Sequence, residues 1–280
     1  MPEGDTLFRT AARLRPILEG RRIEAASARE AELQASSLVD RTVTSVQSCG
    51  KHLLIRLDDS RTIHSHLGMH GSWHVYGKGE AWKKSERLAG LVIEVEACPS
   101  DSDSSTVDAS PRAGVCVCFN PKTLELLSET QLRRHPHLSR LGPDLLGGDL
   151  DMDEVVRRFR VHDTTPIGQA VMNQTIVCGI GNIYKSEVLF MTRVNPFCPV
   201  AELSDEDIVR IVNSARKWLR INAVGGYPRR TRSGLDGARL WVYGRGGRAC
   251  FRCRSRIRVR RQGDLGRTTF WCPRCQAASV

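Results

Sequence analysis

Two cysteine knuckles stand near the end of the chain, Cys250-Phe251-Arg252-Cys253 and Cys272-Pro273-Arg274-Cys275, with residues 254–271 between them. This spacing lets four thiolates close a tetrahedron around one Zn²⁺ ion, while the intervening residues fold as a β-hairpin that turns at Gln262-Gly263-Asp264. A pair of redox motifs or an iron–sulfur site would use the same residues, but neither suits two matched knuckles joined by a hairpin. Because four cysteines leave no open coordination position, we predict one structural zinc ion in a zinc-ribbon finger.

The predicted hairpin is strongly basic. It carries Arg254, Arg256, Arg258, Arg260, Arg261 and Arg267. Because neighbouring side chains of a strand point to opposite faces, the even-numbered arginines are expected to form one basic strip facing phosphates. Zinc ribbons also occur in ribosomal proteins and transcription factors, so this element by itself predicts nucleic-acid binding and no particular activity.

The charge of the whole chain favours the same kind of partner. Its 280 residues carry a formal net charge of +11, with a pI near 9.5, which favours a polyanion. After Asp207 the only acidic residues are Asp236 and Asp264, whereas arginine recurs throughout. A basic tail can also be a merely solubilising surface, but arginine in preference to lysine suits forked contacts with phosphate groups.

The rest of the chain divides into a β-rich first half and a helical second half. Apolar residues at helical spacing predict helices over residues 6–18, 151–159, 167–172 and 182–190, and another that Ser204 caps and Gly225-Gly226 ends. Short β-rich runs predict strands over residues 42–46, 53–57, 62–66, 72–76, 91–96 and 115–119. Residues 99–114, rich in Ser and Asp, are expected to form an exposed hairpin loop.

These elements predict an α+β protein of three domains. Residues 1–126 form an N-terminal helix and β-sandwich, residues 127–241 form a helical domain, and residues 242–280 form the zinc-ribbon finger. The composition, with 40% hydrophobic residues and no apolar run of membrane-spanning length, is that of a globular protein without a membrane segment. No signal peptide is visible, and the six other cysteines are scattered, so we expect a cytoplasmic protein in a reducing compartment.

The start of the chain offers a reactive group. Removal of Met1 leaves Pro2 with a free secondary amine. An α-amine has a much lower pKa than a lysine side chain, so an appreciable fraction is neutral and nucleophilic near pH 7. Glu3 beside it is placed to move protons. Met-Pro-Glu is also a common-looking start, and by itself it would be weak evidence for catalysis.

Several short motifs occur in one order along the chain. They are Pro2-Glu3-Gly4, Gly50-Lys51-His52-Leu53-Leu54, His66-Leu67-Gly68-Met69, Gly179-Ile180-Gly181-Asn182-Ile183-Tyr184 and the terminal knuckles. Together they resemble the formamidopyrimidine-glycosylase/endonuclease VIII family across essentially the whole chain. The resemblance implies an N-terminal helix with a β-sandwich, then a helix–two-turn–helix domain that ends in a zinc-ribbon hairpin.

The resemblance also implies catalytic roles. Pro2 matches the N-terminal proline whose nitrogen attacks C1′ of a damaged nucleoside and forms a Schiff base, and Glu3 matches the carboxylate that transfers protons. Lys51 matches the β-hairpin lysine that contacts DNA phosphate near the reacting sugar and is needed for base excision. The family has a second glutamate close to this position, whereas Asp5-Thr6 stands here.

Four further residues match DNA-binding positions of the family. Asn182 and Arg267 match residues that hold backbone phosphates, Asn182 at a helix start after two glycines, where a helix attracts anions. His66 matches another phosphate-side residue, although a buried structural histidine fits the sequence equally well. Met69 matches the wedge that fills the gap left by the flipped-out nucleotide, although a core methionine is the alternative.

Two features bear on the preferred lesion. Pro2-Glu3-Gly4 resembles the endonuclease VIII-like branch, which favours oxidised pyrimidines. Phe119-Asn120-Pro121-Lys122-Thr123-Leu124 replaces the Asp-Pro-Arg-Arg-Phe-Gly motif with which the oxidised-purine branch reads the orphaned base. We therefore expect oxidised pyrimidines to be preferred, with oxidised-purine (formamidopyrimidine) specificity as the alternative.

The resulting expectation is a bifunctional DNA glycosylase and AP lyase that cleaves by β,δ-elimination. Its partner is damaged DNA, and we expect a monomer that is associated with the nucleoid and uses no small-molecule cofactor. The rival from another class is a non-catalytic DNA-binding zinc-ribbon protein, in which Pro2 and Glu3 can be changed without consequence. A ribosomal or transcription-associated protein would fit the basic tail but would leave the first half unexplained.

Overall fold

The computed structural model describes residues 2–30, 33–96, 114–224, 228–234 and 237–277. It has two compact units, one of Met1–Pro2 and Thr6–Ser139, and one of Glu3–Asp5 and Arg140–Val280. Residues 127–139 thus pack with the first unit, although the sequence analysis assigned them to the second domain. The reason is local, since α2 (Glu129–Arg133) contacts the strand just before it and His135 bonds to Glu125. The three-domain division itself stays a prediction.

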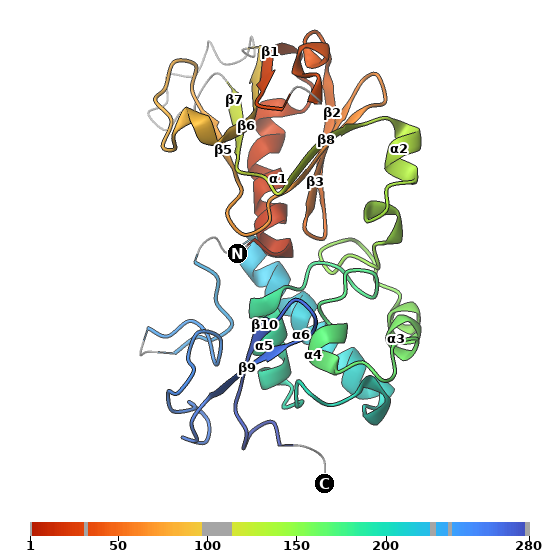
Figure 1. Ribbon diagram of the computed structural model, residues 1–280, viewed down its shortest axis with the longest axis vertical. Helices are drawn as coiled ribbons and strands as arrows, with labels where there is room; N and C mark the ends of the chain where they lie inside the picture. Colours follow the sequence, from red (N-terminus) through yellow and green to blue (C-terminus); the bar gives the residue numbers. More distant parts are fainter. Residues whose placement is uncertain (1, 31–32, 97–113, 225–227, 235–236, 278–280) are drawn as a thin grey trace. The chain divides into compact units, whose positions relative to one another are not determined.

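The first unit is the expected helix with a β-sandwich (Figure 1). One antiparallel sheet has the order β1-β6-β7-β5 and the other the order β2-β3-β4-β8. The strands are β1 (Ile23–Ala28), β2 (Val43–Cys49), β3 (His52–Leu57), β4 (Thr62–His66), β5 (Ser72–Tyr76), β6 (Ala89–Val95), β7 (Val115–Phe119) and β8 (Thr123–Leu127). Leu7, Ala11, Leu14 and Leu18 of α1 (Gly4–Leu18) join residues of both sheets in one hydrophobic core.

The predicted strands are confirmed, whereas β1 and β8 were not predicted. β1 has the sequence Ile-Glu-Ala-Ala-Ser-Ala, which has little β-branched character, and tertiary pairing with β6 makes it a strand. Of the loop expected over residues 99–114, positions 99–113 lie outside the described residues.

In the described part of the second unit the α-helices are α3 (Met152–Arg160), α4 (Ile167–Ala170), α5 (Asn182–Met191) and α6 (Asp205–Val224). Ser204 caps α6 as expected, because its Oγ accepts a hydrogen bond from the Asp207 amide at 3.1 Å. β9 (Arg258–Gln262) and β10 (Arg267–Trp271) form the predicted C-terminal hairpin, and β10 packs against α5.

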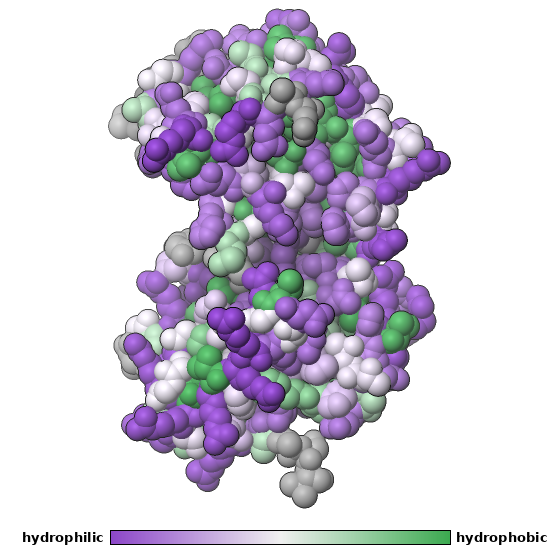
Figure 2. All heavy atoms as spheres, viewed as in Figure 1, coloured by the Kyte–Doolittle hydropathy of each residue, from purple (hydrophilic) through white to green (hydrophobic). Residues whose placement is uncertain are grey.

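The surface drawn in Figure 2 is mostly hydrophilic, and hydrophobic side chains form only small separate groups on that face. Among the described residues, no helix combines the length and the apolar character needed to cross a membrane.

Candidate active site and nucleic-acid interface

Glu3 lies on the N-terminus of α5. Its carboxylate is fully buried and accepts hydrogen bonds from the backbone amides of Gly181 at 3.0 Å, Ile183 at 2.9 Å and Tyr184 at 3.3 Å. The first amides of a helix have no partner within the helix and carry its positive dipole end, so they hold a carboxylate well. The residue next to the half-buried Pro2 is therefore fixed in one orientation.

Glycines allow this close approach. The Gly4 amide donates to the Gly179 carbonyl at 2.9 Å, and a Cβ atom added at Gly181 would lie only 2.4 Å from Cδ of Glu3. A side chain at position 181 would push the carboxylate off the helix end. The Gly-Ile-Gly segment before Asn182 thus allows the Glu3 carboxylate to bind at the N-terminus of α5.

Asp5 forms a buried ion pair that the sequence analysis did not predict. Arg229 donates to its two carboxylate oxygens at 2.9 and 2.5 Å, and also lies 4.0 Å from Oε1 of Glu3. Burial by itself lowers the pKa of Arg229, but the carboxylates of Glu3 and Asp5 outweigh it and raise that pKa above its ordinary value. No sequence pattern links two residues 224 positions apart, so only the fold reveals this pair.

Lys51 occupies the tip of the hairpin between β2 and β3. Cys49 pairs with His52, so Gly50 and Lys51 form a two-residue turn, and Gly50 has a positive φ of 55°. Glycine at the first position of such a turn allows the left-handed conformation that matches the twist of the strands. Lys51 is thus presented on a short turn between two paired strands.

His66 is the last residue of β4, and Met69 lies in the β4–β5 connection that follows. Nδ1 of His66 accepts a hydrogen bond from the Gly68 amide at 3.1 Å, so the neutral ring carries its proton on Nε2. Burial lowers the pKa of His66 to about 4, with Lys122 and Lys51 adding to the shift, so His66 is neutral at pH 7. Met69 is 60% exposed, which excludes the alternative of a core methionine.

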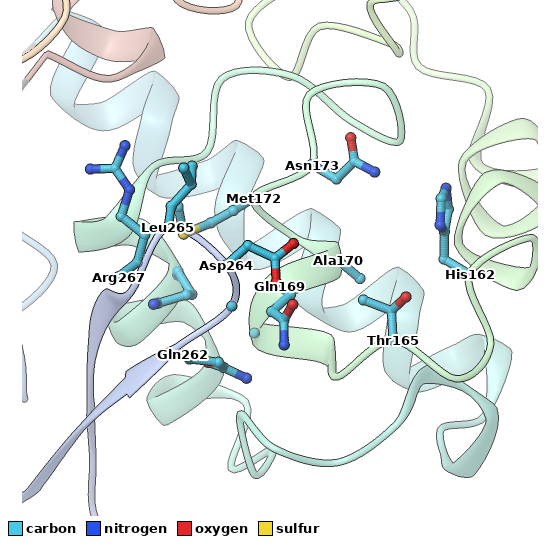
Figure 3. A pocket seen from close by; sticks show the side chains of 13 residues that line it. His162, Thr165, Gln169, Ala170, Met172, Asn173, Gln262, Asp264, Leu265 and Arg267 are labelled. Carbon is cyan, nitrogen blue, oxygen red and sulfur yellow. The ribbon is translucent and has the colours of Figure 1, made fainter.

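Asn182 contacts the C-terminal hairpin, on which Arg267 is the first residue of β10. Nδ2 of Asn182 donates to the Thr268 carbonyl at 2.8 Å, which ties α5 to β10. Its Oδ1 and Nε of Arg267 are buried, and neither has a hydrogen-bond partner among the described residues. Arg267 borders a cavity of about 380 Å³, and in Figure 3 its guanidinium points away from the other labelled side chains that line the cavity.

Two more polar residues of α5 are buried in contacts that the sequence did not predict. Lys185 donates to Thr269 Oγ1 at 2.8 Å, and burial together with nearby Arg267 lowers its pKa to about 8. Glu187 accepts hydrogen bonds from the amides of Trp241, Val242 and Tyr243 at 2.7 to 2.8 Å. α5 therefore holds the chain that leads into the C-terminal hairpin as well as the hairpin itself.

The four cysteines of the two knuckles are clustered. Their sulfur atoms all lie within 4.8 Å of one another, with 3.9 Å between Cys250 and Cys275 and 3.3 Å between Cys253 and Cys272. The amides of Arg252 and Cys275 point at the sulfurs of Cys250 and Cys272, both at 3.4 Å. Of the arginines between the knuckles, Arg254 and Arg256 precede β9, so the basic strip on that strand is shorter than expected.

The chain matches two family descriptions. "Formamidopyrimidine-DNA glycosylase N-terminal domain" covers residues 1–111, and "Formamidopyrimidine-DNA glycosylase H2TH domain" covers residues 141–227. Over 279 residues it is 37% identical to "Probable endonuclease 8 2" of Streptomyces coelicolor, covering 99% of this chain and 94% of that protein. It is 35% identical to "DNA-(apurinic or apyrimidinic site) lyase Nei2" of Mycolicibacterium smegmatis, with 100% of both chains covered.

Solved structures are similar over the full length. The crystal structure of the MutM (Fpg) protein from Thermus thermophilus has 25% sequence identity and a TM-score of 0.77, with 100% of both chains covered. The Lactococcus lactis enzyme bound non-covalently to DNA with an AP site has 23% identity and a TM-score of 0.77, covering 99% of this chain and 100% of that one. The second likeness establishes the fold alone.

Proposed function

Because the chain belongs to the formamidopyrimidine-DNA glycosylase/endonuclease VIII family, in its endonuclease VIII-like branch, we propose that it is a DNA glycosylase with AP lyase activity in base-excision repair. The observation that carries this proposal is the position of Glu3, the residue directly after Pro2. Its buried carboxylate accepts hydrogen bonds from three backbone amides at the start of α5. A protein that only binds DNA has no need to fix a carboxylate beside a free α-amine.

The proposed reaction begins at the Pro2 nitrogen. It attacks C1′ of the damaged nucleoside, the C1′–base bond breaks, and the sugar ring opens to leave a Schiff base between C1′ and nitrogen. Elimination of the phosphate at the 3′ side and then of the phosphate at the 5′ side cuts the strand. Glu3 transfers the protons that ring opening and imine formation require, and Lys51 holds the phosphate beside the reacting sugar.

Damaged DNA is the proposed partner. In this proposal His66, Asn182 and Arg267 contact phosphates, and Met69, whose side chain is exposed, fills the gap in the base stack after base flipping. The net charge of +11 supplies the sequence-independent attraction to the backbone. We propose that the protein acts on nucleoid DNA in the cytoplasm as a monomer, without a small-molecule cofactor, because Pro2 itself supplies the covalent chemistry.

The cysteine cluster fits a structural zinc ion. In a tetrahedron with Zn–S bonds of about 2.3 Å, the sulfur atoms are about 3.8 Å apart. The distances of 3.9 and 3.3 Å bracket this value, and the amides that point at two of the sulfurs suit thiolates. Cys250, Cys253, Cys272 and Cys275 would hold the ion, which would cross-link the two knuckles and stiffen a hairpin too small to have its own core.

Removal of the metal should therefore weaken DNA binding. We expect Cys272→Ser to lose the zinc ion and to bind an abasic-site duplex about tenfold more weakly or worse, because the hairpin carrying Arg267 loses its cross-link. Metal analysis by mass spectrometry and a gel-shift titration measure the two effects. Cys198→Ser is the control, since this half-buried cysteine lies outside the cluster. Full zinc content and affinity in Cys272→Ser would rule out the metal site.

We propose oxidised pyrimidines as the preferred lesions. β7 ends at Phe119 and β8 begins at Thr123, so the segment that departs from the oxidised-purine motif is a short turn without arginine. Without an arginine guanidinium in this turn, we do not expect specific bidentate hydrogen bonds to the base opposite an oxidised purine.

Duplexes that differ only in the lesion test both the function and the preference. We expect kcat/KM for a thymine glycol duplex to exceed that for an 8-oxoguanine duplex at least about tenfold, a difference of about 1.4 kcal/mol. The reverse ratio would assign the oxidised-purine specificity instead. If neither lesion and no abasic site is cut, the proposed function fails.

A further inference from the structure

A row of buried histidines crosses the sheet β2-β3-β4-β8 on the face away from the hydrophobic core. His52 lies on β3, His64 on β4 and Glu125 on β8, and His135 in the loop after α2 completes the row. The three histidines are only 8%, 1% and 8% exposed. The Glu125 side chain in this row is 38% exposed, whereas the three buried histidines need defined hydrogen bonds, because an unsatisfied buried donor or acceptor is costly.

The proton positions follow from the contacts, starting at His135. Its Nδ1 accepts hydrogen bonds from the amides of His137 at 3.2 Å and Leu138 at 3.1 Å, so Nδ1 carries no proton. The proton of the neutral ring is therefore on Nε2, which donates to Oε2 of Glu125 at 3.1 Å.

Glu125 then fixes the next two rings. The same oxygen lies 2.8 Å from Nδ1 of His64, and a carboxylate only accepts, so Nδ1 of His64 donates. Nε2 of His64 is then an acceptor, and it receives a hydrogen bond from Nδ1 of His52 at 2.8 Å. Burial lowers the pKa of His64 by more than Glu125 raises it, and burial with the neighbouring histidines lowers the pKa of His52 to about 3; both shifts favour the neutral rings.

A metal ion is the competing interpretation. One ligand atom each of His64, Glu125 and His135 lie within 4.8 Å of one another, and such a set resembles a zinc site. A metal would need the lone pair of His135 Nε2, yet Nδ1 of that ring already offers its lone pair to two amides. A neutral imidazole has one free lone pair, so the hydrogen-bonded row fits the contacts and the metal does not.

The row ends directly beside two residues of the proposed reaction. His52 follows Lys51 in the hairpin, and its Cα is paired in register with that of His66, with 5.0 Å between the ring centroids. We propose that Glu125 is a positioning residue, which acts through His64 and His52 to hold the hairpin end that presents Lys51. This inference rests on the proposed function, since Lys51 matters only if base excision takes place.

Two substitutions of Glu125 separate this role from a merely structural one. Glu125→Gln keeps an oxygen that accepts both histidine protons, whereas Glu125→Leu removes it. We expect long-range ¹H–¹⁵N spectra to show His64 protonated at Nδ1 and His52 at Nδ1 in the wild type and in Glu125→Gln, and mixed tautomers in Glu125→Leu. Glu129→Leu, the same change at an exposed residue of α2, is the matched control and should leave the spectra unchanged.

The kinetic test uses single-turnover excision of an oxidised base. Because small displacements of a catalytic group are costly, we expect Glu125→Leu to excise about tenfold to hundredfold more slowly. Affinity for the duplex and borohydride trapping at a preformed abasic site should stay within about twofold of the wild type. Glu125→Gln and Glu129→Leu should excise at wild-type rates.

Three results would overturn the inference. Unchanged excision in Glu125→Leu would remove the positioning role and leave the proposed function intact. A second zinc ion per chain that is present in the wild type and lost in Glu125→Leu would show that these residues form a metal site and not a hydrogen-bonded row. If the wild-type protein neither excises bases nor forms a trapped adduct, the proposed function itself is refuted, and the inference is refuted with it.

Discussion

Base excision is expected to fall by about 10²–10⁴-fold in Glu3→Gln, the range that a positioned acid or base contributes. The carboxylate accepts hydrogen bonds on both oxygens, from Gly181 and Tyr184 on one and from Ile183 on the other. A glutamine there would place its amide protons against backbone amides, so it cannot keep all three bonds. The variant therefore loses both the proton transfer and the fixed orientation.

Single-turnover excision with the enzyme in excess measures this effect without a contribution from product release. Glu86→Gln makes the same change at an exposed residue outside the site and should keep the wild-type rate. Glu3→Gln should still bind the duplex, because Lys51, His66 and Arg267 keep their proposed phosphate contacts. A rate in Glu3→Gln within about threefold of the wild type would remove Glu3 from the reaction.

The free energy of unfolding should fall by about 3–5 kcal/mol in Arg229→Met, the cost of removing one partner of a buried ion pair. Arg229 is 9% exposed, and Glu3 and Asp5 are fully buried. Methionine fills the space of the arginine stem but leaves two carboxylates without their cation. The loss acts on Glu3, the proposed proton-transfer residue, so excision should fall together with stability.

Urea denaturation measures the stability change. Arg230→Met is the matched control, because this neighbouring side chain is exposed and Arg230 bonds to Asn222 through its backbone amide and carbonyl; it should change stability by less than about 0.5 kcal/mol. Adding Asp5→Asn to Arg229→Met should recover part of the loss, because a carboxamide is less costly to bury than an unpaired charge. A loss below about 1 kcal/mol in Arg229→Met would show that other contacts, such as the backbone amides that hold Glu3, compensate these carboxylates without Arg229.

The features that local sequence determines were predictable. The knuckles require only that Cys250, Cys253, Cys272 and Cys275 close one cluster, and the hairpin between them follows from the spacing. The apolar periodicity of α1 and the Ser204 cap of α6 likewise act within a few residues. β1 was missed because its pairing with β6, and not its composition, makes it a strand.

The features that join distant segments were not predictable. Arg229 is one of many arginines in the basic tail, and nothing local marks it as the partner of Asp5. The sequence analysis gave a functional role to His66 alone among the histidines, because a histidine in a strand shows neither its burial nor its neighbours. Only the register of β3, β4 and β8 places His52, His64 and Glu125 in one row.

The central claim is that the Pro2 nitrogen forms a Schiff base with DNA, and borohydride trapping tests it most directly. Purified protein is incubated with a labelled abasic-site duplex, reduced, and examined on a denaturing gel. We predict a covalent band whose adduct maps to the tryptic peptide 2–9, and no band from a protein with extra residues before Pro2, whose nitrogen is then an amide. No band from the wild type, with intact duplex binding, would contradict the account and favour a non-catalytic DNA-binding protein.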